Sequence, residues 1–133
     1  MSKQIAIICD HILSSKRVGG MERFYKSLND DLVNRGANVN WYFRDYDGFE
    51  FLGTLNIYSA SGKSVEKEFI SQSKLKAKKY DAIITHFTVI CSRFYKEYSI
   101  LHPQAEIIAV DHNPRPIEGF SYTKKIKNYL KSI

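Results

Sequence analysis

The sequence is poor in the residues that cross-link small secreted domains or hold structural metals. Its 133 residues include two cysteines, Cys9 and Cys91, which form neither a close pair nor a metal-ligand spacing. Few, unpaired cysteines are typical of reducing compartments, so we predict a cytoplasmic protein rather than a disulfide-stabilised one. Neither cysteine lies in a motif that marks a catalytic nucleophile.

Long apolar runs are also lacking. The first apolar segment, residues 4–9, is interrupted by Asp10 and His11, which is too early for a signal peptide. No stretch approaches the ~18 apolar residues that are needed to span a bilayer. Internal repeats and low-complexity segments are absent as well. We therefore predict a single domain over residues 1–133, without a membrane span.

Several well-known catalytic signatures are missing. No Gly-x-Gly-x-x-Gly follows the first apolar segment, and no phosphate loop with its lysine is present, which disfavours classical dinucleotide binding and ATP hydrolysis. No nucleophile elbow of the serine hydrolases occurs. His86 and His112 are too isolated in the sequence to form a zinc site, so no metal is predicted.

What the sequence does contain is enough apolar material for a core and an excess of positive charge. It is 44% hydrophobic and 14% aromatic, with 20 Lys+Arg against 14 Asp+Glu and a formal net charge of +6. This balance favours an anionic partner such as a nucleotide, a nucleic acid or an acidic membrane surface. The alternative is that the charge only aids solubility.

Apolar segments alternate with amphipathic ones along the chain. Residues 44–59 fit a hairpin or an irregular excursion, and the helix after Ser64 has a thin apolar stripe that predicts weak packing. The alternation itself predicts an α/β fold, with a Rossmann-like parallel sheet and helices on both faces. The predicted strands are residues 4–9, 38–43, 81–85 and 105–110, and the predicted helices are residues 21–35, 64–79, 88–101 and 121–133.

A glycine turn lies between the first strand and the first helix. Gly19 and Gly20 permit a tight turn, and the helix that follows has its apolar residues, from Met21 to Val33, on one face. The first N–H groups of a helix have no partner within it and attract anions, which also favours Glu22 in the first turn. This corner could hold a nucleotide diphosphate. It could also be an ordinary turn.

Polar residues follow three of the predicted strands. Parallel strands place their carboxyl ends at one edge of the sheet, where ligands bind in such folds. Histidine and asparagine suit sugar hydroxyls, and an aspartate such as Asp10 could act as a base. We therefore predict a site for a phosphorylated donor and a hydroxylic acceptor. The residues are Asp10 and His11, then His86, and finally Asp111, His112 and Asn113.

Three segments resemble retaining glycosyltransferases of family 4. The first runs from Gly19-Gly20-Met21-Glu22-Arg23 through Leu28, Leu32, Gly36 and Val39, and is similar to the opening of that family. The second is Tyr80-Asp81-Ala82-Ile83-Ile84-Thr85-His86, and the third is Ile107-Ile108-Ala109-Val110-Asp111-His112-Asn113. The resemblance covers most of the chain apart from residues 44–59.

The resemblance implies one half of a GT-B architecture, in which two Rossmann-like domains face each other across a cleft. The chain would be the N-terminal, acceptor-side domain, with the donor-binding domain absent and no transfer by this part alone. The donor would be a nucleotide-sugar, the acceptor a glycan or a lipid-linked glycan, and no metal or other cofactor is expected. The paired-glutamate motif of the family's donor side does not occur in the chain.

Residue roles follow from the same resemblance. Gly19, Gly20 and Glu22 would lie at the donor diphosphate. His112 would contact the transferred sugar, with Asp10 as the second catalytic residue. The acceptor side would include His86, Arg44 and Asn113.

The C-terminal segment is rich in lysine, with Lys124, Lys125, Lys127 and Lys131. One interpretation is peripheral contact with the anionic inner face of the plasma membrane, at about 1 kcal/mol per lysine near such a surface. A solvated helix face is the equally weighted alternative. Aromatic residues interleave too sparsely with the lysines for nucleic-acid binding to be predicted.

The alternative to the glycosyltransferase hypothesis is a non-catalytic Rossmann-like module that binds a nucleotide or another anion.

Overall fold

A computed structural model describes residues 2–14, 20–47, 55–76, 78–86, 88 and 92–110 of the chain. Within these ranges the strands and helices alternate along the sequence, as the apolar pattern predicts. In chain order they are β1 (Gln4–Leu13), α1 (Gly20–Asn34), β2 (Asn38–Tyr46), β3 (Asn56–Ser59), α2 (Val65–Lys76), β4 (Ala82–His86), α3 (Ser92–Leu101) and β5 (Glu106–Val110).

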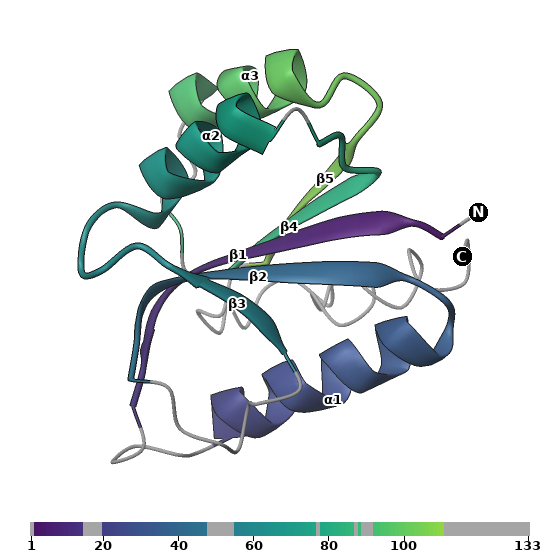
Figure 1. Cartoon of the computed structure of the whole chain (residues 1–133), viewed down its shortest axis with the longest axis vertical. Coiled ribbons are helices and arrows are strands. Elements are labelled where there is room, and N and C mark those ends of the chain that lie inside the picture. The colour runs from purple at the N-terminus through teal and green to yellow at the C-terminus, as the bar shows by residue number, and fades with distance from the viewer. Residues whose placement is uncertain are drawn as a thin grey trace, which may run out of the picture.

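The five strands form a single sheet in the order β3-β2-β1-β4-β5 (Figure 1), and every neighbouring pair is parallel. This strand order is that of a Rossmann-like sheet, so the predicted α/β fold with a parallel sheet and helices on both faces is confirmed. The strand order reverses between β1 and β4, and the carboxyl ends of these two strands mark the position where such sheets bind ligands. Helix α1 covers one face, and α2 and α3 cover the other.

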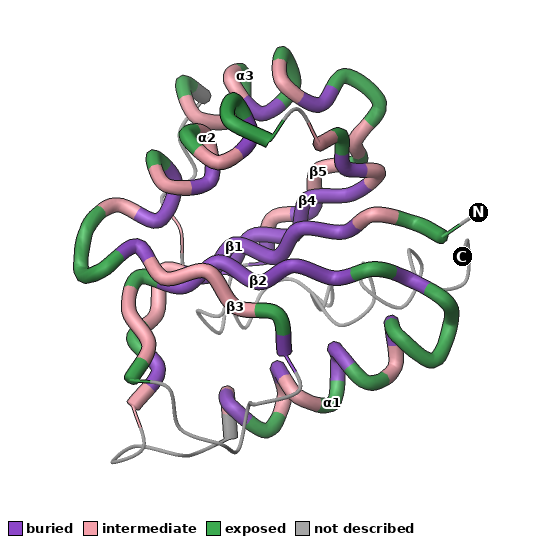
Figure 2. The backbone as a smooth tube through the Cα atoms, viewed as in Figure 1, coloured by how far each residue is buried: buried purple, intermediate pink, exposed green. Residues whose placement is uncertain are grey.

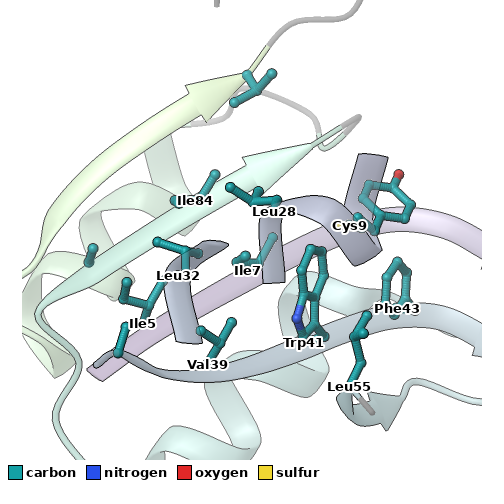
Figure 3. Close-up of a cluster of buried hydrophobic side chains, with 14 of the residues drawn as sticks. Ile5, Ile7, Cys9, Leu28, Leu32, Val39, Trp41, Phe43, Leu55 and Ile84 are labelled. Carbon is teal, nitrogen blue, oxygen red and sulfur yellow. The ribbon is translucent and has the colours of Figure 1, made fainter. Parts of the chain in front are cut away.

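The central strands are buried on both faces, which explains their continuous apolar runs (Figure 2). On the α1 side, alternate residues of β1 pack with β2 residues such as Trp41 and Phe43 (Figure 3). Leu28 and Leu32 of α1 close this cluster from outside the sheet. Val33, which the sequence places on the apolar face of α1, is instead 51% exposed.

The opposite face corrects the expectation that the helix after Ser64 packs weakly. Phe69 of α2 is fully buried, with its ring centroid 5.0 Å from that of Tyr42 and 5.2 Å from that of Tyr98. Val65 is fully buried as well. The apolar stripe of α2 is thin, but its large aromatic residue, Phe69, is buried against the sheet and α3. Helix α2 is therefore well packed.

Local signals fix several element ends. Gly36 follows α1 with φ of +87°, a conformation that favours glycine beyond a helix. The Ser64 hydroxyl accepts a hydrogen bond from the Lys67 N–H at 3.3 Å, so Ser64 is the N-cap of α2 as predicted. The structure ends α3 at Leu101, two residues before Pro103.

The segment over residues 44–59 differs from a simple hairpin. Strand β2 continues to Tyr46, three residues beyond the predicted end, and β3 pairs with it in parallel, from Asn40 opposite Asn56 to Phe43 opposite Ser59. The intervening residues 48–54 lie outside the described ranges, as do residues 111–133 with the predicted last helix. None of the helices that the structure describes is long and apolar enough to cross a membrane.

Candidate functional site

The carboxyl ends of β1, β2 and β4 bring several of the predicted site residues together. Cys9 of β1 lies between Phe43 of β2 and His86 of β4 in the sheet register, so these three residues form one row at the position where the strand order reverses. Helix α1 begins above this row. The row is therefore the floor of the candidate site, and the residues just beyond it are its functional candidates.

His86 ends β4 as predicted, but its side chain is fully buried. Its ring centroid lies 5.9 Å from the ring centroids of both Phe24 and Tyr25, which come from the first turns of α1. The structure thus joins the end of β4 to the start of α1, two of the regions that the sequence predicts to converge. The role of His86 in acceptor binding stays a prediction, and it would require α1 or a neighbouring segment to shift.

A polar group of four side chains, which we call the α1-start cluster, links the end of β1 to α1. It consists of Cys9, His11, Glu22 and Tyr25. The Tyr25 hydroxyl lies 3.0 Å from His11 Nδ1 and is also hydrogen bonded to the Cys9 thiol. His11 Nε2 lies 3.8 Å from Glu22 Oε1. The cluster therefore links helix α1 to strand β1, which precedes it in the chain.

Burial sets the protonation of two members of this cluster. Desolvation raises the pKa of the Cys9 thiol well above its usual value, and the hydrogen bond from Tyr25 only partly opposes this. Desolvation also raises the pKa of Tyr25, with additional contributions from Cys9 and Glu22. Both groups therefore stay protonated at physiological pH. Cys9 behaves as the small buried residue that its place in an apolar run predicts.

The resemblance to family 4 predicts Glu22 at the donor diphosphate. In the structure it is 4% exposed and faces the His11 ring. Gly20 is the first residue of α1, whereas Gly19 lies outside the described residues. The first turn of α1 therefore carries a buried carboxylate with an imidazole beside it.

Asp10 and Arg44, which were predicted for catalysis and acceptor binding, form one ion pair. Arg44 Nε lies 2.7 Å from Asp10 Oδ1, and Arg44 Nη2 lies 3.2 Å from Asp10 Oδ2. The Arg44 side chain is 44% exposed, against 20% for Asp10. Because a carboxylate holds it on one side, the guanidinium is oriented and still offers N–H donors to solvent. This arrangement suits binding better than proton abstraction by Asp10.

The sequence places His11 at the predicted edge of the site but assigns it no role. The signal for it was its place, directly after Asp10 at the end of an apolar strand, but no pattern indicated that Tyr25 and Glu22 would face it. Both residues are buried, whereas the helical pattern predicts core packing for Tyr25 only.

His102 lies away from this edge of the sheet, and its hydrogen bonds support the fold. It is 1% exposed, and its Nδ1 accepts a hydrogen bond from the Tyr80 N–H at 3.1 Å. Its Nε2 lies 2.9 Å from Ser73 Oγ. Since Nδ1 is an acceptor, Nε2 carries the proton and donates to Ser73. Burial, with a smaller contribution from the Lys79 ammonium, lowers the pKa of His102 to about 4.

The remaining predicted site residues, His112 and Asn113, lie outside the described residues. Among the residues that are described, no group of three or more His, Cys, Asp or Glu side chains is arranged to hold a metal ion. Comparisons of the chain with protein-family models, with curated proteins and with solved structures find no match.

Proposed function

We propose that the chain is the acceptor-side domain of a retaining, GT-B type glycosyltransferase similar to family 4. In this proposal it binds a glycan or a lipid-linked glycan, and a second domain supplies most of the contacts to a nucleotide-sugar donor. The chain alone transfers no sugar. The proposal agrees with the Rossmann-like strand order and with the three sequence segments that resemble the family.

The observation that carries the proposal is that two groups of polar side chains lie at the same edge of the sheet. The α1-start cluster and the Asp10–Arg44 pair both lie in the C-terminal half of β1, which continues to Leu13, through the consecutive residues Cys9, Asp10 and His11. One arrangement lies at the start of a helix that follows two glycines, and the other presents an oriented guanidinium. A ligand with both phosphate and hydroxyl groups matches such an edge.

Residue roles in the proposal follow from the resemblance, and the role of Arg44 is also supported by its contact with Asp10. Gly19 and Gly20 bring the backbone close to the donor diphosphate, and Glu22 lies in the helix turn that follows. His112 contacts the transferred sugar, and Asn113 the acceptor. Arg44, held by Asp10, binds an acidic or hydroxyl group of the acceptor. The lysine-rich C-terminal segment would approach an anionic membrane that carries a lipid-linked acceptor, on the cytoplasmic side.

The test is an assay of the natural polypeptide that contains this chain against a panel of nucleotide-sugars and of lipid-linked acceptors. His112→Ala should lower transfer by about 100-fold or more, because a positioned hydrogen-bonding group typically contributes this much to catalysis. Lys26→Ala, at a partly exposed position of α1 whose side chain pairs with Asp30, is the control and should leave transfer unchanged. Turnover near wild type in His112→Ala would remove His112 from the site, and absence of transfer from every donor would end the proposal.

A non-catalytic binding module is the second candidate, and the Asp10–Arg44 contact favours it. A carboxylate that accepts a hydrogen bond from Arg44 Nη2 and is ion-paired with the same guanidinium is poorly placed to take a proton from a substrate. Such a module would bind a nucleotide-sugar or another anion with a measurable affinity and without product. Binding in calorimetry together with no transfer in the panel assay would select this candidate.

A further inference from the structure

Two exposed aliphatic side chains lie at the same end of helices α2 and α3. Leu75 of α2 is 76% exposed and Ile100 of α3 is 68% exposed, more than any other large apolar residue that the structure describes. Each lies two positions from a buried residue of its own helix, Ser73 in α2 and Tyr98 in α3. Two positions turn a side chain by about 200° around an α-helix. Leu75 and Ile100 therefore project from the outer side of the helices, away from the sheet.

Hydrogen bonds hold the C-terminal ends of α2 and α3 side by side. His102, directly after α3, has its Nε2 2.9 Å from the Ser73 hydroxyl of α2. Lys79, shortly after α2, donates through Nζ to the main-chain oxygen of Leu101 at 2.8 Å. Both contacts lie within a few positions of the two aliphatic side chains, which therefore belong to one surface.

Lysine side chains surround this aliphatic pair. Lys74 and Lys76 flank Leu75 in α2, and Lys96 lies one helical turn before Ile100 in α3. All three lysines are exposed. We call this surface the α2–α3 patch, and its members are Lys74, Leu75, Lys76, Lys79, Lys96 and Ile100. The patch therefore combines positive charge with two projecting apolar tips.

The acidic residues of the two helices do not cancel the charge of the patch. Glu66 and Glu68 lie in the first turn of α2, at the opposite end of that helix. Glu66 is 8% exposed, and Glu68 accepts a hydrogen bond from the Gln72 side chain at 2.8 Å. Glu97 of α3 is partly buried, and it is a single carboxylate beside the lysines of the patch.

Helix α1, on the other face of the sheet, shows the contrast. Lys26 Nζ lies 3.0 Å from Asp30 Oδ2, and Arg35 Nε lies 3.3 Å from Asp31 Oδ1. Its cations Arg23, Lys26 and Arg35 are matched by the acids Glu22, Asp30 and Asp31. Among the described helices, the excess of positive charge is therefore local to the layer that α2 and α3 form.

The chemistry of the patch fits an anionic lipid bilayer better than a protein, a nucleic acid or a second copy of the chain. Protein interfaces are depleted in lysine and enriched in tyrosine, tryptophan and arginine, none of which belongs to the patch. Binding of single-stranded nucleic acid relies on exposed aromatic rings. A second copy would bring the same positive charge against it. At an anionic bilayer, lysine heads stay in water beside the lipid phosphates, while short aliphatic tips enter the headgroup boundary.

We propose that the α2–α3 patch binds the surface of an anionic phospholipid bilayer. Leu75 and Ile100 enter the headgroup boundary, and the surrounding lysines lie beside the lipid phosphates. The patch lies at the amino ends of the strands, because Lys79 and Leu101 shortly precede β4 and β5. The candidate site lies at the carboxyl ends, so a bilayer on the patch leaves that site open. A lipid-linked acceptor would reach the site through its glycan.

This inference goes beyond the proposed function and does not depend on it. It also differs from the membrane contact that the C-terminal lysines suggest, because it places the bilayer on two packed helices.

Flotation of the natural polypeptide with lipid vesicles tests the proposal. The vesicles contain phosphatidylcholine alone, or equal parts of phosphatidylcholine and phosphatidylglycerol. The protein should float with the anionic vesicles and remain largely unbound with the neutral ones. Binding to the anionic vesicles should weaken as the ionic strength rises.

Two patch variants separate the contribution of the lysines from that of the aliphatic tips. Lys74→Gln with Lys96→Gln should lower the partition coefficient by roughly 20-fold, about fivefold for each lysine. Leu75→Ser with Ile100→Ser should lower it by about tenfold or more, because the apolar area that enters the headgroup boundary is lost. All four side chains are exposed, so both variants should unfold in urea as wild type does.

Matched controls carry the same kinds of change on α1. Lys26→Gln with Arg35→Gln removes the same charge, from side chains that are 36% and 43% exposed. Val33→Ser alters an aliphatic residue that is 51% exposed. Both controls should bind anionic vesicles as wild type does. A further variant with glutamine at the C-terminal lysines should still bind them; its positions are Lys124, Lys125, Lys127 and Lys131.

Several outcomes would overturn the proposal. They are equal binding to neutral and anionic vesicles, binding that both patch variants leave unchanged, and equal losses in the patch and control variants. Loss of binding in the C-terminal variant alone would assign the contact to that segment and overturn it too. Absence of binding to every vesicle would overturn it and leave the proposed function intact, because transfer to a soluble glycan does not involve the patch.

Discussion

Asp10 and Arg44 join the ends of β1 and β2 through two contacts, Nε to Oδ1 at 2.7 Å and Nη2 to Oδ2 at 3.2 Å. The sequence suggested separate roles for these residues, one as a base and one on the acceptor side. Their contact makes them a single unit, in which the carboxylate orients the guanidinium. A change at either position should therefore alter the same property of the site.

The stability that this pair contributes should be small and sensitive to salt. The Arg44 side chain is 44% exposed, so water competes for the charges, and exposed pairs typically contribute about 0 to 1 kcal/mol. A double-mutant cycle with Asp10→Asn and Arg44→Gln, measured by urea unfolding, should give a coupling energy below about 1 kcal/mol. The coupling should fall further at high ionic strength.

A coupling of several kcal/mol that salt does not change would contradict this expectation. It would mean that the pair is shielded from water, for example by residues outside the described ranges. The same two variants also test in the transfer assay whether the orientation of Arg44 contributes to acceptor binding. Both should raise the KM for the acceptor.

Phe69 should be a major source of stability on the face opposite α1. Its ring is fully buried and packs against the rings of Tyr42 and Tyr98. Phe69→Ala should lower the free energy of unfolding by about 3 to 5 kcal/mol, because it removes a large buried side chain and leaves a cavity. Leu75→Ala, at a position of α2 that is 76% exposed, is the matched control and should change it by less than about 0.5 kcal/mol.

Urea unfolding that follows tryptophan fluorescence of Trp41 can compare both variants with wild type. A loss below about 1 kcal/mol for Phe69→Ala would indicate that α2 is loosely attached, as its thin apolar stripe suggested. Equal losses of unfolding free energy in Phe69→Ala and Leu75→Ala would mean that the side of α2 carrying Phe69 is not its buried side.

The fold could be predicted because its main signals are local. The central strand around Ile7 is apolar on both faces, and only a sheet covered on both sides buries such a run. Gly36 ends α1 in a conformation with positive φ, and Ser64 caps α2 through its hydroxyl. Each of these signals lies within a few residues of the feature that it specifies.

The details of the site could not be predicted because they depend on contacts between distant residues. A helical pattern places Tyr25 in the core, but it does not show that its hydroxyl would face His11, fourteen positions away. It also does not show that Asp10 would meet Arg44 across 34 positions. Val33 shows the converse limit, since an apolar residue that the pattern places on the packed face is half exposed.

His102 should make the fold sensitive to acid. Its pKa in the folded state is lowered to about 4, from an unfolded value near 6.5, mainly by burial. The unfolded chain therefore binds more protons between these two values, and the stability that depends on neutral His102 is fully present above about pH 6.5. It should be lost as the pH falls toward 4, with an upper limit on the order of 3 kcal/mol.

Urea unfolding between about pH 4.5 and 7.5 measures this loss, and ¹⁵N NMR of the imidazole measures the protonation of His102 directly. The ring should remain neutral to below about pH 5, with its proton on Nε2. Ser73→Ala removes the acceptor of that proton and should cost about 1 to 3 kcal/mol at neutral pH. An imidazole that titrates near pH 6.5 in the folded protein would contradict the burial of His102.

Cys9 should be unreactive in the native protein, and its labelling tests the floor of the candidate site. The side chain is fully buried and burial raises the pKa of the thiol, so a thiol reagent should reach it only when the chain opens. In a Cys91→Ser background, which leaves Cys9 as the remaining thiol, labelling should be at least about 1000-fold slower than in urea. Tyr25→Phe, which removes the hydroxyl next to the thiol, should accelerate labelling by roughly 5- to 30-fold, through a loss of about 1 to 2 kcal/mol. Labelling near the rate of the unfolded chain would mean that the row beneath α1 is open to water, and the hydrogen-bonded chain that leads to His11 would then lose its buried end.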